Sequence, residues 1–121
     1  MTLISPPPKK NSIPLIHSIC DLYRKIYLVG LKIPKRDRLG ICAKIESICL
    51  DLINLLISAA FESKDRKLSF LTIARVKTEI LKRLVRLAHE IDVIKSVNYI
   101  ELESQLQEIS KMINGWIKYL K

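Results

Sequence analysis

Residues 39–60 read LGICAKIESICLDLINLLISAA, and their pattern decides which fold the chain can adopt. Fifteen of these 22 residues are apolar. Five of the six polar residues recur at spacings of three and four, which places them on one narrow stripe of a helix: Lys44, Ser47, Asp51, Asn54 and Ser58. An ordinary bundle helix buries about three sevenths of its circumference, whereas this helix would present roughly five sevenths as apolar surface.

The two flanks of this polar stripe are also apolar, and three neighbouring helices cannot easily cover both. Leaving a flank in water would forfeit roughly 1.5–3 kcal/mol for each large side chain. We therefore predict that the helix forms the centre of its own bundle and also contacts another copy of the chain. The residues predicted to make this contact are Ile41, Ile48, Leu50, Leu55 and Ile57.

The remaining sequence predicts three further long helices, because it contains few Gly or Pro residues after position 14 and shows helical apolar periodicity. The four helices are expected over residues 13–32, 39–61, 68–94 and 97–120. In the third helix, the predicted inner face carries Ile73, Ile80, Leu84, Leu87, Ile91 and Ile94, with Phe70, Ala74, Leu81 and Ala88 alongside. Short connections make neighbouring helices antiparallel. The predicted fold is therefore all-α, an up-down-up-down antiparallel four-helix bundle that assembles into a homo-oligomer.

Length and composition indicate one domain preceded by a tail. Residues 1–12 hold Pro6, Pro7 and Pro8 followed by two lysines, and we expect them to be disordered, with the bundle spanning residues 13–121. The sequence shows no signal peptide, and the charged residues within 39–60 argue against a membrane-spanning helix, so we expect a cytoplasmic protein. Its three cysteines lie on apolar faces, where small reduced core side chains are expected.

No constellation of residues predicts catalysis or a cofactor. There is no nucleophile–base set and no Gly-rich phosphate loop, so we expect a non-enzymatic protein. His17 and Asp21 are four residues apart and could bind a metal, but surface histidines beside carboxylates are far commoner than metal sites. A metal-binding bundle is the weakest of the alternatives.

The net charge of +9 favours a polyanionic partner. Two clusters are predicted to bind it: Lys32, Lys35, Arg36 and Arg38 at one end of the bundle, and Lys82, Arg83 and Arg86 along the third helix. A solvated face that only maintains solubility is about equally compatible with this composition. Oligomerisation favours the polyanion, because five copies at +9 each would carry +45.

The aromatic residues nearly all fall in apolar seams, which predicts core packing and not base-stacking platforms. Binding is then expected to go through phosphates and to weaken strongly with salt.

Two motifs resemble one known family. The segment IPKRDRLG at residues 33–40, followed by Ile45 and Glu46, is similar to the junction of the first two helices of Avd proteins, the accessory variability determinants of diversity-generating retroelements. The segment INGWIK at residues 113–118 resembles their C-terminal signature. The chain is also similar to the four-helix-bundle family encoded in ribosomal RNA intervening sequences.

The resemblance implies a barrel-shaped homopentamer that associates with a reverse transcriptase and with nucleic acid, either template RNA or cDNA. It implies a role in mutagenic cDNA synthesis, with Lys35, Arg36 and Arg38 as motif positions available for anion or partner contact. The alternative is an oligomeric four-helix-bundle module for protein interaction, whose charge serves solubility and which has no direct role in nucleic-acid binding.

Overall fold

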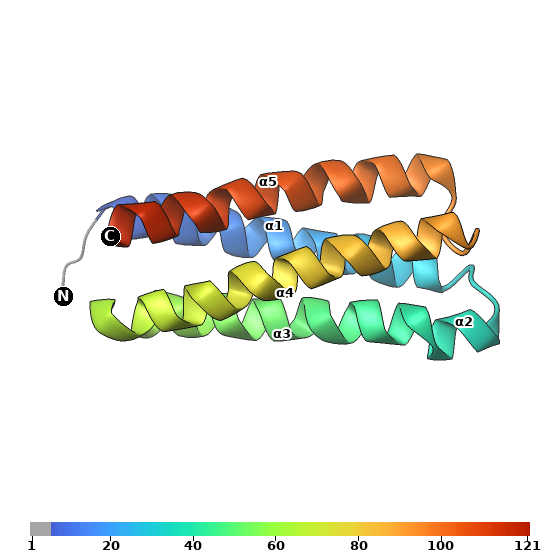
Figure 1. The fold of residues 1–121 in the computed structure, drawn as a ribbon, viewed down its shortest axis with the longest axis horizontal. Coiled ribbons are helices and arrows are strands. Elements are labelled where there is room, and N and C mark those ends of the chain that lie inside the picture. Colours follow the sequence, from blue (N-terminus) through green and yellow to red (C-terminus); the bar gives the residue numbers. More distant parts are fainter. Residues whose placement is uncertain (1–5) are drawn as a thin grey trace.

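The structure, a computed structural model, describes residues 6–121, with side chains described from Ser12 onward. It contains four long helices and one short one (Figure 1), which are α1 Pro6–Gly30, α2 Lys35–Leu39, α3 Ile41–Phe61, α4 Lys64–Glu90 and α5 Ser96–Leu120. No strand occurs within these described residues. The predicted all-α class is confirmed.

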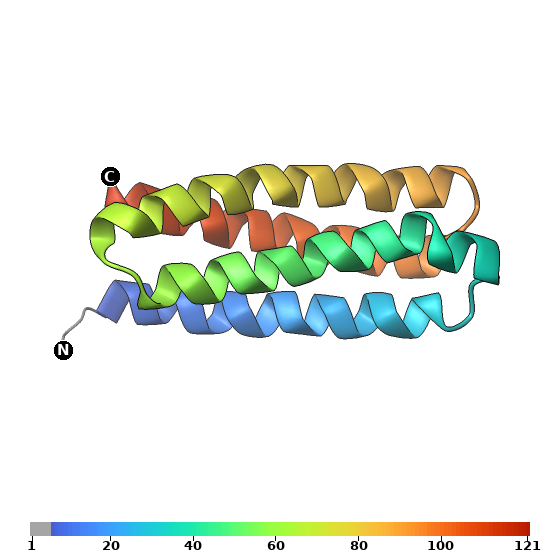
Figure 2. The same ribbon diagram turned by 90° about the horizontal axis from the view of Figure 1, so that it is seen from below.

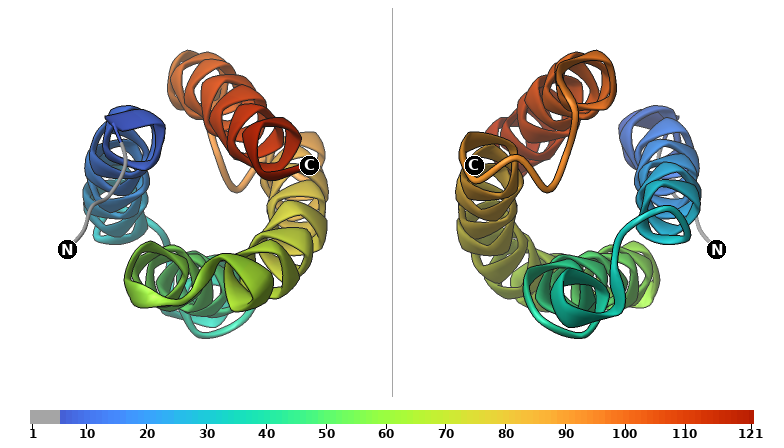
Figure 3. Two further views of the ribbon diagram at one scale, coloured as in Figure 1. Left: turned by 90° about the vertical axis from the view of Figure 1, so that its left-hand side faces the viewer. Right: turned by 90° about the vertical axis from the view of Figure 1, so that its right-hand side faces the viewer.

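The four long helices run antiparallel to their neighbours along the chain (Figure 2). Viewed end-on, they surround one interior in the order α1, α3, α4, α5 (Figure 3), and each long helix packs against the two beside it. This arrangement is the predicted up-down-up-down bundle. One end of it carries α2, the end of α4 and the start of α5; the other carries the α3–α4 turn and the end of α5.

Helix α1 differs from the prediction at its start. It begins at Pro6, whereas the sequence predicted a disordered tail as far as residue 12, and Pro14 lies inside the helix and not in its first turn. Proline lacks a backbone N–H and is expected to interrupt a helix. Helix α1 nevertheless continues through Pro14. The part of the predicted tail over residues 1–5 lies outside the described residues.

The junction after α1 also differs from the prediction. The segment expected to be a plain connector folds into helix α2, in which the backbone N–H groups of Asp37 and Arg38 both donate to the Pro34 carbonyl. Asp37 does not cap the long helix that follows, because Gly40 occupies that position. Lys35, Arg36 and Arg38 of the IPKRDRLG segment thus lie on a single short helix.

Helix α4 ends at Glu90, four residues earlier than predicted. The backbone N–H of Val93 donates to the Ala88 carbonyl, and that of Asp92 donates to the His89 carbonyl. Asp92 has a φ of 63°, so the turn is a Schellman motif with aspartate where glycine is usual. The left-handed residue stops the helix and starts the α4–α5 loop.

Helix α4 buries the side that carries Ala74, Leu81 and Ala88, which the sequence placed alongside the predicted inner face, and leaves most of that inner face half-exposed. Its buried residues are Leu71, Ala74, Thr78, Leu81, Val85 and Ala88. The predicted inner residues Ile73, Ile80, Leu87 and Ile91 are instead 44–53% exposed, although Ile94 is buried as expected. The two apolar stripes are adjacent on the helix, and periodicity does not say which one turns inward. Thr78 fits the core because its hydroxyl donates to the Ala74 carbonyl.

Two of the three cysteines are buried and all are free. Burial raises the pKa of the Cys49 thiol to about 12. The thiolate is the reactive form of cysteine, so this side chain is an inert component of the core.

Candidate nucleic-acid interface

The first predicted basic cluster lies at the α2 end of the bundle. Lys32 follows α1, and Lys35, Arg36 and Arg38 project from α2; all four side chains are exposed. Within the described residues, none of the four forms an ion pair with an acidic side chain. The cluster is therefore solvated and available to an anion.

The second predicted cluster lines a groove between α4 and α5. The groove has a volume of about 200 Å³, and its lining residues are Glu79, Lys82, Arg83, Arg86, Tyr99, Glu103 and Gln107. The structure thus brings the three predicted basic residues of α4 together in one concave surface.

The three cations of the groove differ in how strongly they are already engaged. Lys82 Nζ lies 3.2 Å from Glu79 Oε2 and donates to Gln107 Oε1 at 3.4 Å. Arg86 Nε lies 3.8 Å from the carboxylate of Glu90, at the edge of ion-pair distance. Arg83 has no ion-pair partner among the described residues and is exposed. Arg83 and Arg86 are therefore the groove cations most available to a ligand.

Two carboxylates in the groove limit its positive charge. Glu79 accepts a hydrogen bond from Ser110 Oγ at 3.5 Å as well as pairing with Lys82. Glu103 accepts from Gln107 Nε2 at 3.4 Å. The groove therefore offers both hydrogen-bond donors and acceptors beside Arg83 and Arg86, and its lining is not uniformly positive.

Tyr99 packs against the core, as its place in an apolar seam predicted, and it also lines the groove, which the sequence did not indicate. Its ring stacks on His89 with centroids 4.3 Å apart and planes 3° from parallel. His89 Nδ1 lies 3.0 Å from the Ile94 carbonyl, which can only accept, so this nitrogen carries the hydrogen. Only the α4–α5 register, which sequence periodicity does not supply, brings Tyr99 opposite these residues.

Two other kinds of site are not found in the described part of the chain. No group of three or more His, Cys, Asp or Glu side chains there could hold a metal ion. None of its helices is long and apolar enough to cross a membrane.

The comparison with protein families gives a match over nearly the whole chain. The model of the bAvd-like family matches residues 15–120. The chain belongs to the bAvd-like family. The Avd resemblance of the two sequence motifs is thereby confirmed, and the family is one of accessory proteins of diversity-generating retroelements that are generally non-catalytic. A search of curated proteins finds no match.

In this bAvd-like chain, the predicted contact residues of α3 divide into two groups. Ile48 is only 5% exposed, so the prediction that the subunit leaves it uncovered is wrong. Ile41 and Leu55 are half-buried on the same flank, which α4 approaches through the Lys77–Asp51 ion pair. Leu50 and Ile57 lie on the other flank and remain 48% and 39% exposed. The flank toward α1 is thus the one left in solvent.

A second exposed apolar surface lies on α4. It consists of Ile73, Val76, Ile80 and Leu87, with Ile91 just beyond the helix end. These residues follow helical spacing and so form one continuous stripe. The bAvd-like subunit therefore carries two separate apolar surfaces, one on α3 and one on α4, and the described side chains, from Ser12 onward, leave both partly exposed.

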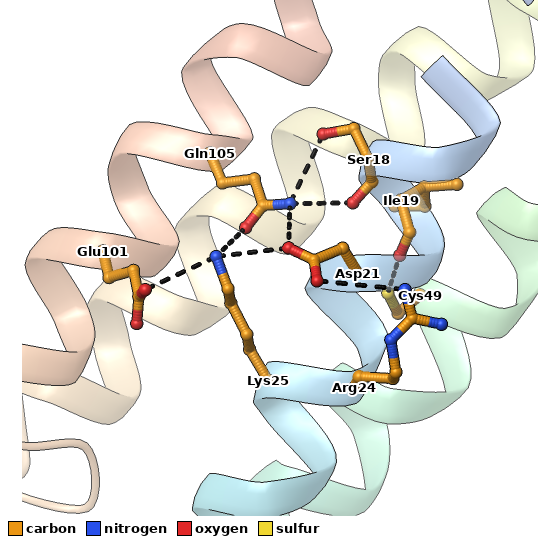
Figure 4. A network of polar contacts seen from close by, with 8 residues as sticks. All are labelled: Ser18, Ile19, Asp21, Arg24, Lys25, Cys49, Glu101 and Gln105. Atoms are coloured by element: carbon orange, nitrogen blue, oxygen red, sulfur yellow. Dashed lines mark hydrogen bonds and ion pairs between the residues drawn. The ribbon is translucent and has the colours of Figure 1, made fainter. Parts of the chain in front are cut away.

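A polar seam joins α1 to α5 (Figure 4). Gln105 Nε2 donates to the Ser18 carbonyl and to Asp21 Oδ2, at 2.9 and 3.2 Å. Lys25 Nζ donates to Gln105 Oε1 at 2.9 Å and pairs with Asp21 and Glu101 at 3.2 and 3.4 Å. The hydrogen bond from Gln105, and then Lys25, lowers the pKa of the Asp21 carboxyl.

The polar seam bears on the metal site considered for His17 and Asp21. The Asp21 carboxylate is already bonded by Gln105 and Lys25. It is therefore committed to joining two helices, which leaves it poorly placed to ligate a cation.

Proposed function

We propose that this bAvd-like chain is a cytoplasmic, non-catalytic, homo-oligomeric accessory protein that binds template RNA or cDNA and a reverse transcriptase, and so supports mutagenic cDNA synthesis. Nucleic acid is held through phosphate contacts. The binding residues are Lys32, Lys35, Arg36 and Arg38 at the α2 end, and Lys82, Arg83 and Arg86 in the α4–α5 groove.

The observation that carries this proposal is the separation of basic from apolar surface on one subunit. Lys82 and Arg86 lie on the flank of α4 beside α5, Ile80 and Leu87 lie on its other exposed flank, and Arg83 lines the groove from a position between the two. Copies that associate through the apolar flank leave the groove open to solvent. The assembly therefore concentrates positive charge on the surface that remains accessible.

The two apolar surfaces also suggest how copies associate. A twofold dimer buries the same patch on both subunits, whereas two different patches favour a head-to-tail contact. Head-to-tail contacts close into a ring when the rotation between subunits allows it. We propose that the α3 surface of one subunit meets the α4 stripe of the next, and the family resemblance suggests a ring of five.

The net charge of such a ring supports a polyanionic partner. Each subunit contributes +9, and the mutual repulsion of five subunits is relieved when phosphates neutralise the lysines and arginines. Binding of this kind releases counterions, so the affinity falls steeply as salt increases.

The test compares three matched double substitutions in the full chain. Arg83→Glu/Arg86→Glu alters the groove, Arg36→Glu/Arg38→Glu alters the α2 end, and Lys118→Glu/Lys121→Glu alters the opposite end. Each lowers the net charge from +9 to +5. Filter binding to single-stranded RNA and DNA is measured at several salt concentrations, with circular dichroism as the control for folding.

We expect the first two variants to lose at least about tenfold in affinity, with a salt slope shallower by up to about 2, because phosphate contacts are removed. The third variant should change binding little. Equal losses in all three would show that net charge alone binds the polymer. No affinity of the wild-type protein at low salt would favour the protein-interaction module, for which the uncovered apolar surfaces are the supporting observation.

A further inference from the structure

We propose that the α4–α5 groove takes one nucleotide of a single strand, with its base stacked near Tyr99 and its phosphate at Arg83 and Arg86. This inference rests on the proposed function and sharpens it, because phosphate contacts alone do not distinguish a single strand from a duplex.

Tyr99 is held in place before any ligand arrives. Its ring lies parallel to that of His89 at 4.3 Å, and His89 is fixed by its hydrogen bond to the Ile94 carbonyl. Ile94 is itself 3% exposed and anchored in the core. Tyr99 is partly buried against the core and its accessible part lines the groove. Because the ring is already immobilised, it loses little side-chain entropy when a base packs against that part.

The cations of the groove are arranged beside this ring. Arg83 and Arg86 are three residues apart on α4 and so lie one turn from each other. Lys82 is engaged by Glu79 and Gln107, whereas Arg86 has only the 3.8 Å contact with Glu90, so Arg83 and then Arg86 are the groove's phosphate ligands. Arginine suits this role because its planar guanidinium can bind phosphate through two hydrogen bonds.

The other lining residues fit the edge of a base. The carboxylate of Glu103 and the amide of Gln107 are hydrogen-bonded to each other at 3.4 Å and face the same groove. The groove volume of about 200 Å³ holds several waters at about 30 Å³ each, and a planar base would displace them. Bases within a duplex are stacked on each other and paired, so only an unpaired base can enter.

The experiment uses the full chain and two oligonucleotides of equal length, one single-stranded and one duplex, each containing 2-aminopurine, whose fluorescence falls on stacking. The variants are Tyr99→Leu and Tyr99→Phe. Tyr119→Leu is the matched control, because Tyr119 is an exposed tyrosine near the far end of the same helix.

For the wild-type protein we expect quenching and an affinity for the single strand about tenfold above that for the duplex. Tyr99→Leu should lose that tenfold preference and the quenching while it keeps duplex affinity. Tyr99→Phe and Tyr119→Leu should behave as wild type. If Tyr99→Leu binds and quenches like wild type, the inference is wrong although nucleic-acid binding stands. If wild type binds neither oligonucleotide at low salt, the proposed function fails as well.

A second measurement needs no variant and so does not depend on the folding of Tyr99→Leu. The wild-type protein is photo-crosslinked to a single strand that carries 5-bromouracil, and the attachment site is located by mass spectrometry. Crosslinking at Tyr99 is expected. Crosslinking only at other residues would overturn the assignment of the base to this groove.

Discussion

The two exposed flanks of α4 have opposite chemistry. One flank carries Ile80 and Leu87, each 44% exposed, the other carries Lys82 and Arg86 beside α5, and Arg83 lies at the border between them. Both flanks lie next to the same buried stripe, which includes Leu81. A helix that only had to complete a four-helix bundle would need one apolar face. The second apolar face and the charged face are therefore surplus to folding, and we interpret both as interaction surfaces.

The contrast between the flanks separates assembly from ligand binding. Changes on the apolar flank should alter association between copies and leave the groove intact, whereas charge reversal in the groove should do the opposite. If both kinds of change affected both properties equally, the division of α4 into two surfaces would be wrong.

The largest effect is expected from the double substitution Ile80→Glu/Leu87→Glu. Each side chain would otherwise contribute roughly 1.5–3 kcal/mol when buried against another copy, and a carboxylate placed there adds a desolvation penalty. We expect light scattering coupled to size exclusion to show monomers with unchanged helix content. The control is Thr72→Glu/Arg75→Glu, which places two carboxylates at exposed positions of α4 outside the apolar stripe. An intact oligomer in the first variant would remove the stripe from the interface.

A somewhat smaller effect is expected on the free energy of unfolding, and it should differ between neighbouring residues of α4. Leu81→Ala should lower the free energy of unfolding by about 2–5 kcal/mol, because it opens a cavity in the core. Ile80→Ala removes a comparable side chain from the exposed flank and should change the stability of the isolated subunit by about 0.5 kcal/mol or less. Urea denaturation below the association concentration measures both. Equal losses would mean that Ile80 and Leu81 are buried to the same extent, which would contradict the division of α4 into a buried and an exposed stripe.

The smallest effect is expected for the stability contribution of the polar seam between α1 and α5, whose charged side chains contact each other within one subunit. The pKa of Asp21 is lowered from its ordinary value of 3.8, first by Gln105 and then by Lys25. Its stabilising contribution is thus present above pH 3.8 and is lost as the pH falls through the lower folded value. Because this side chain is 45% exposed, the contribution should stay within about 1 kcal/mol.

The variant Asp21→Asn checks this directly. Its deficit in unfolding free energy relative to wild type should be present at pH 7 and should shrink as the pH approaches 2. A deficit that is constant across this range would show that the seam is held by hydrogen bonding from Gln105, independent of the aspartate charge.

Much of this fold follows from local patterns. The polar stripe of α3, the break at Pro34 and the short connections predicted four antiparallel helices, and the structure has them. Local patterns failed where backbone conformation was unusual for the residue type: Asp92 ends α4 in a left-handed conformation that favours glycine. In α4 they placed Ala74, Leu81 and Ala88 near the core correctly but centred the inner face on the neighbouring stripe, because two adjacent apolar stripes fit the same helical period.

The basic clusters were also evident from sequence, since charged residues have no place in the core. The residues that surround these clusters in space were not evident from the sequence. That Gln107 accepts from Lys82, or that His89 stacks on Tyr99, depends on which residue of α5 lies opposite each residue of α4. The α1–α5 seam is a similar case, since Asp21 and Gln105 are 84 residues apart in the chain.

By itself, the amino-acid sequence determined the class of fold, the antiparallel order of the helices and the excess of both apolar and basic surface. These properties depend on composition and on spacing along a single helix. Only the tertiary structure decided which stripe of α4 is buried, that Ile48 belongs to the core while Leu50 and Ile57 do not, and that Tyr99 borders the arginines. Those outcomes depend on the rotation and register of one helix against another, which are set by packing of side chains that lie far apart in the chain.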